Sequence, residues 1–163
     1  MSGIDSVEIQ RLLPHRYPFL LVDRIERCEP GHRIVGWKCV SRHDCKSSGG
    51  QPGRQTMPDA LVLEVMAQVA VILTFKTLDM SERSGQLFFF AGIDKTRFQR
   101  RPGIGDRMLV EARVERIMKA RGVGRFSTRA TIDDELVAQA TMLAAVRAHS
   151  DDQDVSAVGV TLT

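Results

Sequence analysis

A single carboxylate and a single amide interrupt the longest apolar run of this chain. From Ala60 to Leu73 almost every residue is apolar, which is typical of a helix enclosed by other structure. Glu64 and Gln68 are four residues apart, so both side chains lie on one face of that helix. A buried carboxylate is costly unless it is hydrogen-bonded or protonated, which makes Glu64 a candidate for proton transfer. The alternative is a structural carboxylate paired with Gln68.

The elements that would position this helix are short and strand-like. Pro58 suits the first turn of a helix that we expect to end near Leu78, and Asp59 suits its positive N-terminal end. A short helix is predicted over residues 6–13, capped by Ser6 and ended by Pro14. Strands are predicted over residues 19–28, 33–40, 87–98, 106–120, 124–132 and 135–148. One long apolar helix with antiparallel strands indicates an α+β protein.

Composition limits the class of protein. The chain has 163 residues, of which 43% are hydrophobic and 26% charged, as expected for one globular domain over residues 1–149 with a flexible tail over 150–163. The net charge of +3 is too small to indicate a nucleic-acid partner. Three cysteines without a C-x-x-C spacing favour free thiols in the cytoplasm. No membrane span, metal site or phosphate-binding loop is expected, because the apolar run carries Glu64 and Gln68 and the required spacings are absent.

Three motifs in order resemble the beta-hydroxyacyl-acyl carrier protein dehydratases of fatty acid synthesis. Residues 13–24 read LPHRYPFLLVDR, as in that family. Residues 57–68 read MPDALVLEVMAQ and resemble its M-P-G-x-L-x-x-E-x-M-A-Q, and FAGID at 90–94 is a third match. The resemblance covers roughly residues 7–148 and implies a hot-dog fold, in which an antiparallel sheet wraps around one long central helix. It also places the last strand at 135–148, where alanine content alone would allow a helix.

The resemblance fails at one chemically decisive position. In the family, the loop before the helix reads G-H-F-P-G, and its histidine is the catalytic base. An ungapped count back from Met57 puts Gly50 at the histidine position, while the family's acid is retained as Glu64. We expect His15 to pack structurally and His43 to be an exposed loop residue, so neither replaces the base.

The resemblance also implies further site residues and no cofactor. We expect the substrate to contact Gln68, Asp59, Gly53, Pro58 and Phe90, with helix capping as the competing role of Asp59. Positive charge at Arg97, Arg100 and Arg101 is a candidate contact for the acyl carrier protein, although these side chains are also what a solvated strand end would carry.

Three functions remain open from the sequence. In the first, the chain is a dehydratase of fatty acid or polyketide-type synthesis that is impaired alone and completes its site with a His-bearing hot-dog subunit. Alternatively, it is a non-catalytic acyl-binding or stabilising subunit, or a hot-dog thioesterase in which Glu64 activates water. In each case we expect a homodimer or heteromer, because a lone hot-dog sheet would expose a strand edge.

Overall fold

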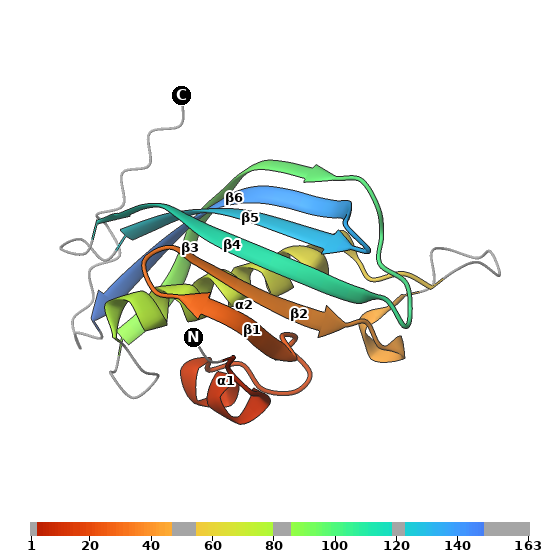
Figure 1. The fold of residues 1–163 in the computed structure, drawn as a ribbon, viewed down its shortest axis with the longest axis horizontal. Coiled ribbons are helices and arrows are strands. Elements are labelled where there is room, and N and C mark those ends of the chain that lie inside the picture. The colour runs from red at the N-terminus through yellow and green to blue at the C-terminus, as the bar shows by residue number, and fades with distance from the viewer. Residues whose placement is uncertain (1–2, 47–54, 80–85, 119–122, 149–163) are drawn as a thin grey trace, which may run out of the picture.

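One long helix lies along the concave face of a single curved sheet in the computed structural model of the chain (Figure 1). The structure describes residues 3–46, 55–79, 86–118 and 123–148. Its elements are α1 (Ser6–Leu12), β1 (Arg24–Glu29), β2 (Arg33–Cys39), the 3-10 turn η1 (Arg42–Asp44), α2 (Asp59–Leu78), β3 (Gln86–Phe98), β4 (Arg107–Met118), β5 (Val123–Ile132) and β6 (Glu135–Ala148). The predicted α+β architecture, a sheet around a central helix, is confirmed.

The central helix α2 starts one residue after the predicted position and ends at Leu78 as predicted. Pro58 is its N-cap residue, and Asp59 lies in the first turn, where a carboxylate complements the helix dipole. All side chains from residue 65 to residue 75 are buried. The helix is long and apolar enough to cross a membrane, but 67% of its apolar window is buried inside the protein, as expected for a core helix.

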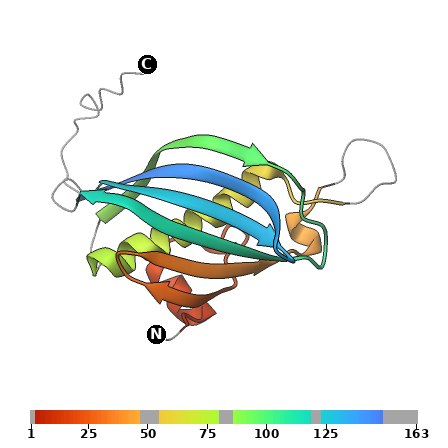
Figure 2. The ribbon, with the colours of Figure 1, turned by 45° about the horizontal axis from the view of Figure 1, so that its top comes forward.

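The sheet has the strand order β1-β2-β4-β5-β6-β3, and all neighbouring strands are antiparallel. Figure 2 shows α2 crossing beneath the four inner strands, with β3 and β1 at the two edges. The strand predicted over 135–148 is confirmed at both ends, and four others are confirmed to within two residues. The family resemblance was therefore a better guide to β6 than helix propensity.

The strand predicted over residues 19–28 is wrong in its first half, because β1 begins only at Arg24. The backbone N–H groups of Phe19 and Leu20 donate to the carbonyl oxygen of Arg16 at 2.7 and 3.0 Å, which closes a turn. The next two N–H groups donate to the side chain of Gln68. These backbone groups have partners outside a strand ladder, so the apolar pattern here packs without forming a strand.

The cap of α1 is also different from the prediction. Oδ1 of Asp5 accepts a hydrogen bond from the N–H of Glu8 at 2.8 Å, so Asp5 caps the helix and Ser6 is its first residue. The buried face of α1 carries Ile9 and Leu12. Nζ of Lys76 lies 2.6 Å from Oε1 of Glu8, which ties α1 to the last turn of α2.

The inner face of β2 carries a glycine, Gly36, at a crowded position next to β1. Burial alternates along β2, and Gly36 is among its buried residues. A Cβ atom at Gly36 would lie 2.6 Å from Cδ1 of Ile25, 3.0 Å from the carbonyl oxygen of Arg24 and 3.4 Å from Cγ2 of Val69. A side chain at this position would therefore force Ile25 and the backbone of Arg24 in β1 to move, whereas its contact with Val69 of α2 would be an ordinary one.

Candidate active site

Glu64 lies in the second turn of α2, and 28% of its side chain is exposed. Its Oε1 accepts a hydrogen bond from Nε2 of Gln68 at 2.9 Å, and Nε2 of His15 lies 3.5 Å from the same oxygen. We call these three residues the Glu64 cluster. The predicted pairing with Gln68 is confirmed, whereas the carboxylate is partly accessible and less enclosed than we expected.

Gln68 is only 1% exposed, and its amide group has a fixed orientation. Its Oε1 accepts hydrogen bonds from the backbone N–H groups of Leu21 at 3.0 Å and of Val22 at 3.4 Å. Its Nε2 also donates to the carbonyl oxygen of Phe19 at 2.7 Å. Because backbone N–H groups can only donate, the amide oxygen must face Leu21 and the NH2 group must face Glu64. Gln68 therefore always presents a donor to the carboxylate.

His15 is the member of the cluster that sequence reasoning missed. We expected a packing role, and the residue does lie in the loop between α1 and β1. Its Nε2 faces Glu64, while its Nδ1 is buried without a hydrogen-bond partner in the described part of the chain. A proton on Nδ1 would be a buried donor without an acceptor, so the ring favours the tautomer with its proton on Nε2, toward Glu64. The available signal was the motif at 13–24, which supplies both His15 and the backbone groups that bind Gln68.

The residues on either side of the loop that would carry the base lie beside each other, just before the start of α2. Gly50, which the ungapped count assigns to the family's histidine position, and Gly53 lie outside the described residues. On either side of that segment, the N–H of Lys46 donates to the carbonyl oxygen of Thr56 at 3.1 Å. The N–H of Met57 donates to the carbonyl oxygen of Pro102 at 2.8 Å. The two ends of the segment are thus fixed next to each other.

A buried ion pair fixes η1, which leads into the same loop. Nζ of Lys38 lies 3.2 Å from Oδ2 of Asp44, and each side chain is only 9% exposed. The N–H and the hydroxyl of Ser41 both donate to Oδ2 of Asp44 at 2.7 Å. Burial alone would raise the pKa of Asp44, but the Ser41 hydrogen bonds and the nearby Lys38 ammonium outweigh it, so this pKa lies below its ordinary value.

Two of the arginines predicted to contact a carrier protein are engaged within the chain. Nε and Nη2 of Arg101 lie 3.1 and 3.3 Å from the two carboxylate oxygens of Asp59, so the guanidinium and carboxylate meet side by side. Arg100 pairs with Asp106 at 3.4 Å and with Glu135 at 3.2 Å. Asp59 therefore has an ion-pair partner in addition to its place in the first turn of α2.

The other predicted site residues are only partly described. Pro58 is partly buried at the N-cap of α2, near the turn that carries Glu64. Phe90 belongs to β3, but its side chain lies outside the described residues. Arg97 is exposed on β3 and forms no ion pair with any described residue. Substrate contact by these residues stays a prediction.

The Glu64 cluster is suited to moving a proton at a carboxyl group. Oε1 of Glu64 is oriented by a donor from Gln68 and faces Nε2 of His15. Oε2 makes no hydrogen bond or ion pair to the described residues, and the carboxyl group reaches solvent. A positioned carboxyl group with one oxygen engaged and the other available can act as a general acid or a general base.

Comparisons with known proteins identify the family of the chain. The FabA-like domain matches residues 13–141. The 3-hydroxyacyl-[acyl-carrier-protein] dehydratase FabZ of Variovorax paradoxus (strain S110) is 43% identical over 146 residues, covering 90% of this chain and 96% of the relative. FabZ of Chloroflexus aggregans (strain MD-66 / DSM 9485) is 45% identical over 139 residues, covering 85% and 93%.

A solved structure confirms the predicted hot-dog fold. The dehydratase heterocomplex ApeI:P from Xenorhabdus doucetiae matches with a TM-score of 0.71 at 16% identity, covering 86% of this chain and 91% of that one. At this identity the likeness establishes the fold alone, while the sequence relatives and the domain match establish descent. The chain therefore belongs to the FabA-like family and groups with its FabZ-type 3-hydroxyacyl-[acyl-carrier-protein] dehydratases.

Proposed function

We propose that this chain supplies Glu64 as the general acid for dehydrating a 3-hydroxyacyl thioester carried on an acyl carrier protein. The observation that carries the proposal is the Glu64 cluster, in which the buried amide of Gln68 orients a partly accessible carboxyl group. The FabZ relatives, which are dehydratases of such substrates, support the choice of reaction. The proposed location is the cytoplasm, because the three cysteines are free and free thiols suit a reducing compartment.

The reaction requires two proton transfers. A base removes a proton from C2 of the acyl chain, and the electron pair forms the C2–C3 double bond. The C3–O bond breaks, and the departing hydroxyl takes a proton from Glu64 and leaves as water. Glu64 then returns to its acid form by accepting a proton from the solvent or from the protonated base. Each positioned acid or base contributes about 10²–10⁴-fold to the rate.

We further propose that the base comes from a second chain. The ungapped count assigns Gly50 to the position of the family's histidine, and glycine has no side chain to accept a proton. His15 does not fill this role, because its Nε2 faces Glu64 and its Nδ1 is buried. The isolated chain is therefore expected to be a poor dehydratase, and a hot-dog subunit with an intact G-H-F-P loop would complete the site.

The edge strand β3 is the proposed place of assembly. In the described sheet β3 pairs only with β6, so its other edge offers unpaired backbone groups. The large apolar side chains of Ile93 and Phe98 are 41% and 37% exposed on this strand. Sedimentation of the purified 18.2 kDa chain tests this: a dimer agrees with the proposal, and a folded monomer refutes self-association.

An activity assay of the assembled complex tests the role of Glu64. Glu64→Gln keeps the shape of the side chain and removes its proton, so it should lower the dehydration rate by about 10²–10⁴-fold. Glu115→Gln is the matched control, because Glu115 is an exposed partner of Arg125 far along β4. Full activity of the Glu64→Gln complex would assign Glu64 a structural role and leave the chain a stabilising subunit.

A further inference from the structure

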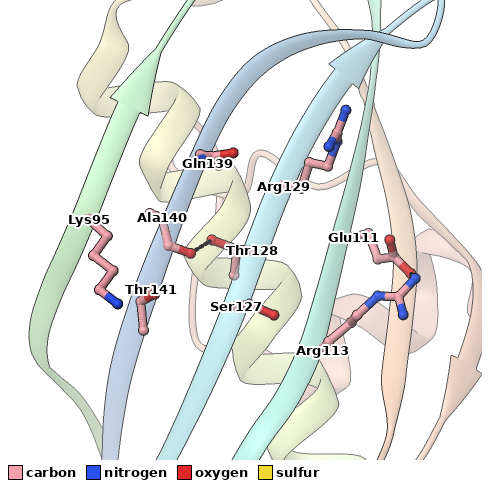
Figure 3. A pocket seen from close by; sticks show the side chains of 9 residues that line it. All are labelled: Lys95, Glu111, Arg113, Ser127, Thr128, Arg129, Gln139, Ala140 and Thr141. Carbon is pink, nitrogen blue, oxygen red and sulfur yellow. Dashed lines mark hydrogen bonds and ion pairs between the residues drawn. The ribbon is translucent and has the colours of Figure 1, made fainter.

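The outer face of the sheet carries a groove of about 590 Å³ that dehydration does not use (Figure 3). The groove crosses β4, β5 and β6 and reaches β3, while α2 lies on the opposite side of the sheet. Burial along β5 fixes this orientation, because the groove residues Ser127 and Arg129 flank Thr128, whose side chain is buried. The sheet therefore separates this groove from the helix that bears Glu64.

The strand register arranges the groove side chains in two rows. Directly opposite residues form the rows Glu111, Arg129, Gln139 and Arg113, Ser127, Thr141. Since neighbouring strands lie about 4.8 Å apart, each row spans about 10 Å from β4 to β6. Opposite side chains on one sheet face are close enough to act on the same bound group.

The positive charge of the groove is only partly compensated. Oε1 of Glu111 lies 2.9 Å from Nη2 of Arg113 and 3.8 Å from Nη1 of Arg33, so the β4 side is balanced. Arg129 and Lys95 form no ion pair within the described parts of the chain, since the carboxylate opposite Arg129, that of Glu111, is engaged by Arg113. The side of the groove formed by β5, β6 and β3 therefore offers two uncompensated cations beside hydroxyl and amide groups.

Lys95 is presented by an irregular backbone. The register of β3 against β6 shifts between Asp94 and Arg97, which marks a bulge in the edge strand. Lys95 lies in this bulge with φ at 51°, in the left-handed region that non-glycine residues rarely adopt. Figure 3 shows its side chain extending toward Thr141. Bulges redirect side chains, and this one brings an ammonium group to the groove.

We propose that this outer groove docks an acidic segment of a partner protein, a function beyond the proposed dehydration. Carboxylates of such a segment would pair with Arg129 and Lys95, while Ser127 and Gln139 donate hydrogen bonds between them. The groove lies open on a sheet face and runs across strands, which suits an extended chain with several carboxylates. The attraction is local, because the whole chain carries a net charge of only +3.

Binding of a fluorescein-labelled octaglutamate peptide, followed by fluorescence anisotropy of the full-length chain, tests the proposal. We expect binding that weakens when the salt concentration is raised from roughly 0.05 to 0.15 M. Arg129→Glu and Lys95→Glu should each weaken binding by about tenfold. Arg125→Glu is the matched control on the same strand, since Arg125 already pairs with Glu115 at 2.9 Å outside the groove, and it should change binding by less than about twofold.

Thermal unfolding of every variant checks that the fold is intact, and Arg129→Gln replaces Arg129→Glu if charge reversal unfolds the chain. Equal losses in the Arg129 and Arg125 variants would show diffuse charge attraction and overturn the groove as a site. Absence of peptide binding, or unchanged binding in both groove variants, would overturn it as well.

Discussion

Nε2 of His15 lies 3.5 Å from Oε1 of Glu64, although the two residues belong to different segments of the chain. The loop between α1 and β1 brings the ring to α2, and the same loop gives three backbone groups to Gln68. Glu64 is therefore contacted by a side chain from its own helix and by one from the N-terminal loop. This contact is the basis for predicting that His15 positions the proposed acid.

His15→Ala should lower the activity of the assembled complex by about tenfold or more and change its pH profile, because Glu64 loses one of the two groups that orient its proton. His15→Gln, which retains a side-chain donor, should recover part of the rate. His43→Ala is the control, since His43 is exposed in η1. Rates measured across pH check this, and a profile identical to wild type would reduce His15 to a packing residue.

Asp44→Asn should destabilise the fold by about 1–3 kcal/mol near neutral pH, because the buried Lys38 ammonium loses its nearer charged partner and keeps only Asp23 at 3.9 Å. The pKa of Asp44 is lowered in the folded chain, so its ionised form stabilises the fold above the ordinary carboxyl range. That contribution disappears as the pH falls through the lowered pKa. The difference between wild type and variant should therefore narrow below about pH 4.

Urea unfolding at several pH values measures that difference. The double variant Lys38→Met/Asp44→Asn removes both charges and should regain much of the stability near neutral pH. If Asp44→Asn lowers the free energy of unfolding by the same amount at every pH, the ion pair is not the source of the destabilisation.

Gly36→Ala should destabilise the fold by about 1–3 kcal/mol, since the new methyl group would meet Ile25 and the backbone of Arg24. Gly92→Ala is the matched control in β3, because a Cβ atom there meets nothing within 4 Å. Thermal unfolding compares the two substitutions. Equal stability of both variants would mean that Ile25 and the backbone of Arg24 do not approach Gly36 as closely as described.

Local sequence patterns predicted most of the helices and strands, because the apolar residues that form the patterns are also the residues that pack into the core. The apolar run with Pro58 before it predicted α2, and strand alternation predicted β2, β4 and β5, whereas β6 was predicted from the family resemblance. The pattern failed at residues 19–22, where Leu21 and Val22 are buried as expected but the backbone N–H groups donate to Arg16 and Gln68 instead of a neighbouring strand. Helix capping by Ser6 failed for a simpler reason, because Asp5 is an equally good cap one residue earlier.

The candidate site was only half predictable. Glu64 and Gln68 share a helix, so their pairing follows from helical spacing alone. The contact of His15 with Glu64 depends on how a distant loop packs onto α2, which no local pattern encodes. In the proposed function the base comes from a second chain, and the residues of this chain do not specify that partner.

The most direct test of the account measures 3-hydroxyacyl thioester dehydration by the purified chain with Gly50→His. We predict that the wild type is nearly inactive, and that Gly50→His raises the rate by up to about 10²–10⁴-fold, through a base opposite Glu64. Gly49→His is the control for placing an imidazole in the same loop, and adding Glu64→Gln to Gly50→His should abolish the gain. Strong wild-type activity that is insensitive to substitution of Gly50 would contradict the account, because another residue of this chain would then be the base.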